Sequence, residues 1–220
     1  MKQQNEDQTT LEMLCNEQAI EITHPMVEQL VRYRDYLEQW NQKINLVSRK
    51  EDAPVLIKHI FHSLLITLHH TFFNGEQVLD LGTGGGLPGI PLAIIHSESN
   101  FVLIDATGKK IAACQAMIKA LGLKNAVAIH GRAEEIKNMI FDTVLSRQVA
   151  PLDKLCGWAE PLLKTNGSLI CLKGGALERE IRQALAGSKY HNNFPSHIDL
   201  YPIHGINQFF TEKQIVIAQG

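Results

Sequence analysis

The feature that most constrains the fold of this chain is an alternation of short apolar runs with amphipathic stretches from residue 77 onward. The apolar runs predict five strands: QVLDL (77–81), NFVLID (100–105), AVAIH (126–130), FDTVLS (141–146) and SLICLK (168–173). Helix patterns lie between and after these strands, near residues 88–96, 108–121, 133–139, 151–163 and 176–187. Continuous Val, Ile and Leu runs separated by helices are typical of a parallel sheet covered on both faces. The sequence therefore predicts a doubly wound α/β sheet with right-handed crossovers.

The two ends of the chain depart from this alternation. Two further strands, without a full helix between them, predict an antiparallel finish at one edge of the sheet: HIDLYPI (197–203) and QIVIAQ (214–219). Upstream of the sheet, apolar residues from 25 to 44 recur at the spacing of one helix face, and a second helix opens near Pro54. We therefore expect a helical extension, residues 1–76, packed on a sheet domain of residues 77–220.

Composition and cysteine usage indicate a globular protein of the cytoplasm. The 220 residues are 45% hydrophobic and 20% charged, which is ordinary for a chain that buries a core. The first ten residues, MKQQNEDQTT, are polar, so we expect them to be disordered and not to form a secretory signal. No apolar run is long enough to span a membrane. The four cysteines form no CxxC pair, so we expect neither a disulfide framework nor a zinc site.

Four histidines lie on the polar half of the second predicted helix: His59, His62, His69 and His70. A metal site would need further ligands, but no cysteine or carboxylate lies beside them on that face. The pattern therefore predicts a solvated polar face.

A glycine-rich turn, GTGGGLPG (82–89), follows the first predicted strand. In a doubly wound sheet, ligands bind outside the carboxyl ends of the strands, so these glycines lie where a ligand is expected. The turn matches G-x-G-x-x-G, which is a weak pattern on its own. Asp105, which ends the second strand, stands where a carboxylate would bind ribose hydroxyls. A nicotinamide dinucleotide and another adenosine cofactor both fit these features.

Two details favour S-adenosylmethionine. A buried carboxylate at Asp80, just before the turn, would repel a pyrophosphate and suit the ammonium group of an amino acid. Pro88 and Pro91 remove two backbone N–H donors from the start of the next helix, so the ligand should need few anion contacts. S-adenosylmethionine carries an ammonium group and no phosphate. The candidate cofactor-binding residues from this reasoning are Asp80, Gly82, Gly84 and Asp105.

The extended string DLGTGGGLPGIPLAI (80–94) resembles the first motif of the RsmG family, also called GidB. Other family-like segments occur in order: NLVS (45–48), KHIFHSL (58–64), LIDATGKK (103–110), GRAEE (131–135), LSRQVAPL (145–152) and LKG (172–174). The resemblance covers roughly residues 25–175. It implies a Rossmann-like class I methyltransferase sheet with an N-terminal helical extension. It also implies a bacterial enzyme that methylates N7 of one guanine in 16S ribosomal RNA, using S-adenosylmethionine.

The resemblance also places cofactor contacts, which fall by position on Gly82, Leu87, Ala133, Glu134 and Arg147. Glu134 suits an adenine amino group, and the backbone of Ala133 suits a ring nitrogen. Arg147, at the carboxyl end of the central strand, is the candidate catalytic residue, in contact with the cofactor, the guanine or an RNA phosphate. The chain departs from the family pattern at His62, where an aspartate is usual, and at Gln148, where an alanine is common.

The chemistry implied by the resemblance needs no general base, because N7 of guanine carries a lone pair and no proton. Holding RNA needs cations near the pocket, and the formal net charge of −2 means that any basic patch is local. Basic residues predicted near this edge of the sheet are Lys109, Lys110, Arg132, Arg147, Lys173, Arg179 and Arg182. We expect 16S rRNA within a small-subunit particle as the partner, a monomeric protein, and neither a metal nor a membrane.

Two other functions are alternatives. A NAD-dependent dehydrogenase would use the same glycine turn, and Asp80 argues against it. A non-catalytic RNA- or ribosome-binding module would keep the pocket only as a remnant of the fold, and the presence of Asp80, Gly82, Gly84 and Arg147 argues against that. Binding of NAD would support the first alternative, and failure to bind any adenosine cofactor would support the second.

Overall fold

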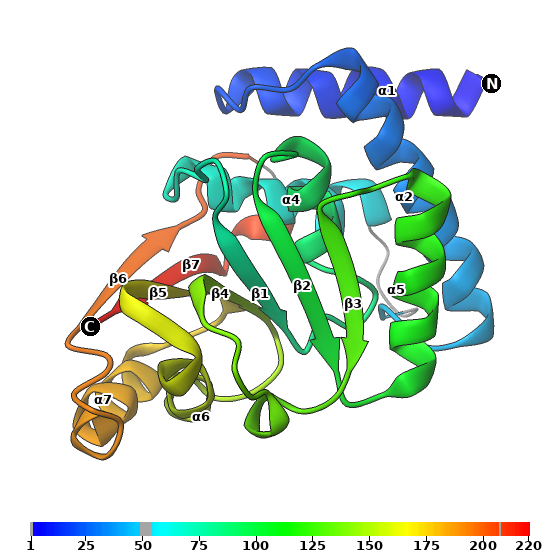
Figure 1. Cartoon of the computed structure of the whole chain (residues 1–220). Coiled ribbons are helices and arrows are strands. Elements are labelled where there is room, and N and C mark those ends of the chain that lie inside the picture. The colour runs from blue at the N-terminus through cyan, green and yellow to red at the C-terminus, as the bar shows by residue number, and fades with distance from the viewer. Residues whose placement is uncertain (1, 49–53, 207) are drawn as a thin grey trace.

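The computed structural model describes residues 2–48, 54–206 and 208–220, and a seven-stranded sheet forms its centre (Figure 1). The strand order is β3-β2-β1-β4-β5-β7-β6. The strands are β1 (Gln77–Leu81), β2 (Asn100–Asp105), β3 (Ala126–His130), β4 (Phe141–Arg147), β5 (Leu163–Gly174), β6 (His197–Pro202) and β7 (Lys213–Gln219). Strands β1 to β5 pair in parallel, whereas β7 is antiparallel to both β5 and β6. The predicted doubly wound sheet with an antiparallel edge is therefore confirmed.

Alternation of side chains along each strand explains why the sheet is covered on both faces. In β2, Phe101 and Leu103 join one hydrophobic cluster, whereas Val102 and Ile104 join a second cluster on the other face. Successive side chains of a strand point to opposite faces, so an unbroken apolar run buries residues in both directions. All four of these side chains are buried.

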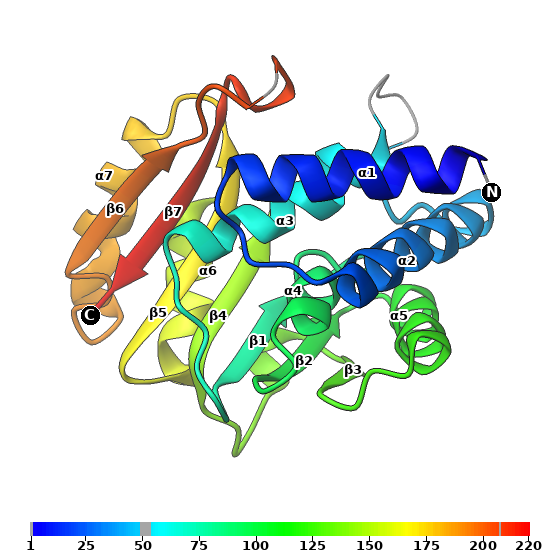
Figure 2. The same cartoon turned by 90° about the horizontal axis from the view of Figure 1, so that it is seen from above.

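Helices cover the two faces unequally (Figures 1 and 2). The first face is covered by α2 (His24–Lys43), α4 (Gly89–Ile95) and α5 (Gly108–Leu121), with α1 (Lys2–Glu17) lying across α2. The second face is covered by α6 (Leu152–Ala159) and α7 (Glu178–Gly187), which pack on each other. The first hydrophobic cluster joins the N-terminal helices to the sheet, since it contains Leu11 and Leu30 together with Leu103 and Ile217. The division after residue 76 stays a prediction.

The expected disorder of residues 1–10 is wrong, because α1 begins at Lys2; Met1 lies outside the described residues. Leu11, Leu14 and Cys15 are buried at the three- and four-residue spacing of one helix face. Composition misses this face because, among the described side chains, the buried ones lie in the second half of the helix, after a polar first half.

The predicted helix near residues 133–139 is also wrong beyond one 3-10 turn, η3 (Ala133–Glu135). Its backbone leaves the helical region at Ile136, which has ψ 123°, and Asn138 adopts φ 61°. The side chain of Glu135 accepts a hydrogen bond from the backbone N–H of Arg132 (3.0 Å), which closes this turn on itself.

The helix predicted from Pro54 is present but irregular. It consists of a π-helical segment, η1 (Leu56–Phe61), then α3 (His62–Leu64) and a 3-10 segment, η2 (Leu65–Leu68). The predicted solvated face is wrong for His59 and His62, which are buried at 8% and 4% exposure. Two causes act together. The π segment departs from the regular helical spacing. Both side chains also meet distant parts of the chain, since His59 hydrogen-bonds with Arg147 and His62 packs against Phe210.

Candidate functional site

The turn after β1 is built around the carboxylate of Asp80. Its Oδ2 accepts hydrogen bonds from the Thr83 hydroxyl (2.5 Å) and from the backbone N–H of Gly89 (2.8 Å), the first residue of α4. Burial raises the pKa of Asp80 to about 6, although these two hydrogen bonds oppose the shift. A Cβ at Gly89 would lie 2.7 Å from Oδ2, so glycine permits this approach. The structure thus places Asp80 behind the turn, outside the cavity wall.

Gly82 is the first residue of the turn and lines the cavity. Its backbone adopts a left-handed conformation, with φ +73°. A Cβ at this position would lie 2.5 Å from a methyl carbon of Val149, in the loop after β4. The backbone N–H groups of Gly82 and Thr83 both donate to the carbonyl of Ile104 (2.9 Å each). Backbone conformation and packing therefore both require glycine here.

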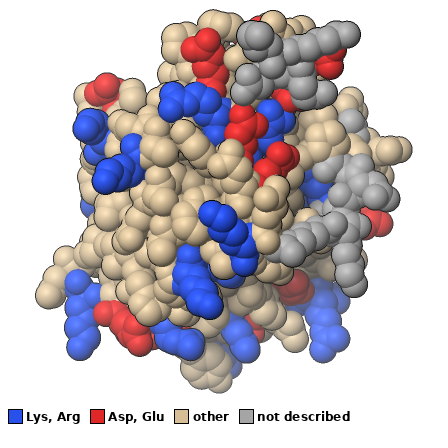
Figure 3. All heavy atoms as spheres, turned by 90° about the vertical axis from the view of Figure 1, so that its right-hand side faces the viewer, with Lys and Arg blue, Asp and Glu red and all other residues tan. Residues whose placement is uncertain are grey.

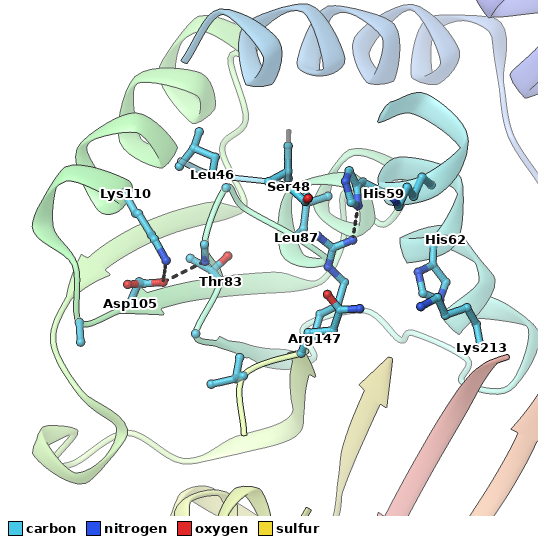
Figure 4. A pocket seen from close by; sticks show the side chains of 18 residues that line it. Leu46, Ser48, His59, His62, Thr83, Leu87, Asp105, Lys110, Arg147 and Lys213 are labelled. Carbon is cyan, nitrogen blue, oxygen red and sulfur yellow. Dashed lines mark hydrogen bonds and ion pairs between the residues drawn. The ribbon is translucent and has the colours of Figure 1, made fainter. Parts of the chain in front are cut away.

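A cavity of about 430 Å³ opens over this turn (Figure 4). Asp105 lies in its wall, where Oδ2 accepts from the Gly84 N–H (3.1 Å) and Oδ1 from the Thr107 N–H (2.8 Å). The Lys110 ammonium lies 3.7 Å from Asp105 Oδ2. A carboxylate has about four lone-pair directions, so Asp105 keeps acceptor capacity for a ligand hydroxyl. The lining residues are Leu46, Val47, Ser48, Lys58, His59, His62, Gly82, Thr83, Gly84, Gly85, Leu87, Asp105, Ala106, Lys110, Arg147, Gln148, Val149 and Lys213.

A second, smaller hollow of about 180 Å³ adjoins the cavity. The two share lining residues, among them Gly82, Asp105 and Val149. Ala133 and Glu134 line only the smaller hollow, together with apolar groups that include Trp158. The structure thus places the predicted pair from η3 beside the predicted turn, in a hollow that adjoins the main cavity.

Arg147 ends β4 and contacts a residue from a distant part of the chain. Its Nη1 donates a hydrogen bond to Nδ1 of His59 in η1 (2.8 Å; Figure 4). Burial lowers the pKa of Arg147 to about 10, and the guanidinium stays charged near neutral pH. Burial, reinforced by the charge of Arg147, lowers the pKa of His59 to about 2. His59 is therefore the neutral acceptor in this pair.

Lys58, His62 and Lys213 also line the cavity, and the sequence analysis assigned no function to any of them. Lys58 and His62 lie within the family-like segment 58–64, so the resemblance could have pointed to them. Lys213 had no signal in the sequence. It opens β7, and its position opposite Gly174 in the sheet brings it to the cavity.

The predicted basic edge is only partly present. Lys110 and Arg147 line the cavity, but the Lys173 ammonium is buried and pairs with Glu180 (2.7 Å). On the face shown in Figure 3, Lys and Arg are dispersed, with Asp and Glu among them. The basic side chains to consider for RNA binding are therefore those that line the cavity.

Within the described ranges, His, Cys, Asp and Glu side chains form no group of three or more that could hold a metal ion. None of the helices in these ranges combines the length and the apolar character needed to cross a bilayer. Each of the four cysteines is buried as a free thiol.

Comparison with known proteins gives a consistent family. The family model described as "GidB: rRNA small subunit methyltransferase G" matches residues 26–202. "Ribosomal RNA small subunit methyltransferase G" of Pelodictyon phaeoclathratiforme is 64% identical over 220 residues, which cover 100% of this chain and 96% of the relative. The protein of that name from Aeromonas salmonicida is 40% identical over 174 residues, covering 79% and 82%.

Solved structures resemble the fold at low sequence identity. M. jannaschii TYW2 in complex with AdoMet has a TM-score of 0.61 at 16% identity, covering 81% of this chain and 78% of that chain. A SAM dependent methyltransferase from Aquifex aeolicus has a TM-score of 0.57 at 13% identity, covering 83% and 97%. At this identity the likeness concerns the fold alone.

Proposed function

The chain belongs to the GidB family of small-subunit ribosomal RNA methyltransferases, and from that premise we propose that it transfers a methyl group from S-adenosylmethionine to N7 of a guanine in 16S rRNA. The observation that carries the proposal is the meeting of the β1 turn, Asp105 and Arg147 around one cavity at the carboxyl ends of the central strands. In a sheet of this type, that is where a ligand binds.

The residues present fit S-adenosylmethionine. The smaller hollow, with Ala133, Glu134 and apolar walls, suits the adenine ring. Asp105 has acceptor capacity left for the ribose hydroxyls, and Gly82 brings bare backbone close to the ligand. Leu87 adds an apolar wall in the larger cavity. When bound, this cofactor supplies a methyl group activated by a sulfonium centre.

For Asp80 we propose an indirect role in cofactor binding. Its hydrogen bonds to Thr83 and Gly89 hold the turn and the start of α4 in place, and its negative charge lies buried beneath them. A buried negative charge stabilises a nearby ammonium group and disfavours a pyrophosphate. Asp80 therefore favours S-adenosylmethionine over NAD without entering the cavity.

The residues of the chain act by positioning and by exclusion of water. N7 of guanine attacks with its own lone pair, so no side chain has to remove a proton. Alignment of the two reactants in a shaped cavity then supplies the rate enhancement. Arg147, fixed by His59, is the candidate residue for contact with the reacting groups. Gly84 belongs to the same turn and donates its N–H to Asp105, which orients that carboxylate.

The proposed substrate is 16S rRNA within a small-subunit particle. The net charge of −2 makes the chain a weak binder of free RNA by long-range attraction. A particle would supply contacts that free RNA lacks. We propose that the chain acts as a monomer in the cytoplasm.

Transfer of labelled methyl groups from S-adenosylmethionine tests the proposal. The acceptors are small subunits that lack their own N7-methylguanosine and, in parallel, free 16S rRNA. We expect label in the particle, less label in free RNA, and a large loss with Arg147→Ala. If cofactor binds but neither RNA acquires label, the assigned substrate is wrong; if NAD binds instead, the cofactor is wrong too.

A further inference from the structure

The part of the cavity beyond Arg147 has a different character from the part near Asp105. Figure 4 shows Asp105 and Lys110 on one side of Arg147, with His62 and Lys213 on the other. Lys58 from η1, His62 from α3 and Lys213 from β7 line the cavity but not the smaller hollow. Three separate elements thus bring basic groups to one wall, away from the region that suits adenine.

The ionisable groups that line this wall are basic. Asp105 is the acidic residue in the lining, and it is paired with Lys110. Neither Arg147 nor Lys213 forms an ion pair with a described carboxylate. The groups repel one another: burial lowers the pKa of Lys58, and the charges of Lys213 and Arg147 lower it further. Because Arg147 and Lys213 lack a described carboxylate partner, their charges favour the binding of an anion at this wall.

His62 provides an independent sign of a ligand. The side chain is 4% exposed and packs against the ring of Phe210 at a centroid distance of 5.3 Å. Its Nε2 is buried and has no hydrogen-bond partner among the described residues. Buried polar atoms are nearly always paired, and an orphan in the wall of a cavity indicates a missing partner.

We propose that Lys58, His62 and Lys213 form a subsite that binds a phosphate group of the RNA strand next to the target guanine. The inference rests on the proposed function and specifies how its substrate is held. RNA carries one phosphate per nucleotide, so a guanine placed beside Arg147 brings a phosphate close to it. The two lysines donate charge-assisted hydrogen bonds to phosphate oxygens, and the imidazole of His62 supplies a further donor.

A bound anion changes the protonation preference of His62. Burial and the charges of Arg147 and Lys213 lower the pKa of His62 to about 3 in the free protein. A bound phosphate introduces negative charge beside the ring and favours its protonated form. Binding of the phosphate therefore becomes tighter as protons become available to His62.

A nucleotide titration tests the subsite directly. The full chain, saturated with S-adenosylhomocysteine, is titrated with guanosine and with guanosine 5′-monophosphate, and broadening of the base H8 proton resonance is measured. We expect the nucleotide to bind roughly tenfold more tightly than the nucleoside, since a hydrogen bond to a charged group contributes that much or more. Inorganic phosphate should compete with the nucleotide but not with guanosine.

Lys213→Gln should remove most of the difference in affinity between guanosine 5′-monophosphate and guanosine, and His62→Asn should remove part of it. The matched control is Lys119→Gln, which removes an exposed lysine from the last turn of α5. The affinity of each variant for S-adenosylmethionine, measured by calorimetry, should stay within about twofold of the wild type, because the subsite lies beyond Arg147. With small subunits as substrate, Lys213→Gln should raise KM and lower the salt slope of log KM by about 0.7 to 1.

Two results would overturn the subsite while the proposed function stands. Equal affinity for guanosine and its monophosphate, with methyl transfer intact, would show that no phosphate binds there. A large loss of S-adenosylmethionine affinity in Lys213→Gln would assign the basic wall to the cofactor instead. If the wild-type chain transfers no methyl group at all, the proposed function fails, and the H8 titration still decides whether the subsite exists.

Discussion

Arg147 and His59 lie 88 positions apart in the sequence and are joined by a hydrogen bond of 2.8 Å from Nη1 to Nδ1. The bond links the carboxyl end of the central strand to an N-terminal helical segment that precedes the sheet. A guanidinium held by a neutral imidazole keeps its charge and its remaining donors for a ligand. The N-terminal helices thus do more than cover the sheet, because one of them orients the candidate catalytic side chain.

His59 is therefore expected to act as a positioning residue. His59→Ala should lower methyl transfer by roughly tenfold, since one hydrogen bond to a charged group is lost. His59→Asn should restore part of the rate, because its amide oxygen accepts a hydrogen bond. Steady-state kinetics with both substrates, together with thermal unfolding, measures the effect. If His59→Asn is as impaired as His59→Ala at equal stability, the hydrogen bond has no such role.

Gly82 is expected to be indispensable for cofactor binding. Gly82→Ala forces a side chain into a left-handed backbone conformation and against Val149. Both effects displace the turn, so affinity for S-adenosylmethionine should fall by at least tenfold in calorimetry. The matched control is Gly122→Ala at the end of α5, where φ is +70° and no atom lies within 4 Å of the added carbon. That variant should lose about 1 kcal/mol of stability and keep its cofactor affinity.

Glu76, directly before β1, is expected to stabilise the sheet at the end opposite the cavity. Its buried carboxylate accepts hydrogen bonds from His70 (2.8 Å), Thr143 (2.7 Å) and the backbone of Phe73 (3.1 Å). Glu76→Ala leaves these donors without a partner and should lower the free energy of unfolding by about 3 kcal/mol. Urea unfolding measures this, with Glu98→Ala at an exposed position as the control. A loss no greater than that of the control would mean that water replaces the carboxylate.

Stability should fall as the pH decreases from 7 to 5. The buried His59 and His62 and the partly buried His96 have pKa values lowered to about 2, 3 and 4, whereas unfolded histidine titrates near 6.5. In this interval the unfolded state binds more protons, so protons favour unfolding. Asp80 opposes this trend, because its pKa is raised to about 6 and the folded state binds its proton first.

Replacing one of these histidines isolates its contribution. His96→Leu should reduce the slope of unfolding free energy against pH near pH 5 by about 1.4 kcal/mol per pH unit, which corresponds to one proton. His204→Gln, at an exposed position, serves as the control. Equal slopes for His96→Leu and the wild type would mean that His96 becomes protonated in the folded state as readily as in the unfolded chain.

The sheet could be predicted from the sequence because its signal is local. Strand β2 is an unbroken apolar run whose side chains alternate between two covered faces, and its predicted bounds are confirmed residue for residue. The same holds for β1 and β3. Strand β5 begins at Leu163, five positions before the predicted strand. The prediction misses this first part because its residues 164–166 are polar and exposed. Pairing in the sheet there overrides the weak local preference.

The site was only partly accessible to sequence reasoning. Gly82, Asp105 and Arg147 follow strands, so topology alone brings them to one edge. A regular helical wheel, at 100° per residue, predicts that His62 faces solvent. The prediction is wrong because the π segment before His62 breaks that spacing. Lys213 lies at the start of an edge strand, and nothing in its neighbourhood along the chain indicates a cavity. Its place follows from the antiparallel pairing of β7 with β5.

Nucleoside analysis of the RNA product shows which atom of which base the chain methylates. Small subunits lacking N7-methylguanosine are incubated with the full chain and S-adenosylmethionine, their 16S rRNA is digested, and the methylated nucleoside is identified by mass spectrometry. We expect N7-methylguanosine close to one equivalent per particle, and its near absence with Arg147→Ala. A methyl group on another guanine atom or another base, or none while the cofactor binds tightly, would contradict the proposed reaction.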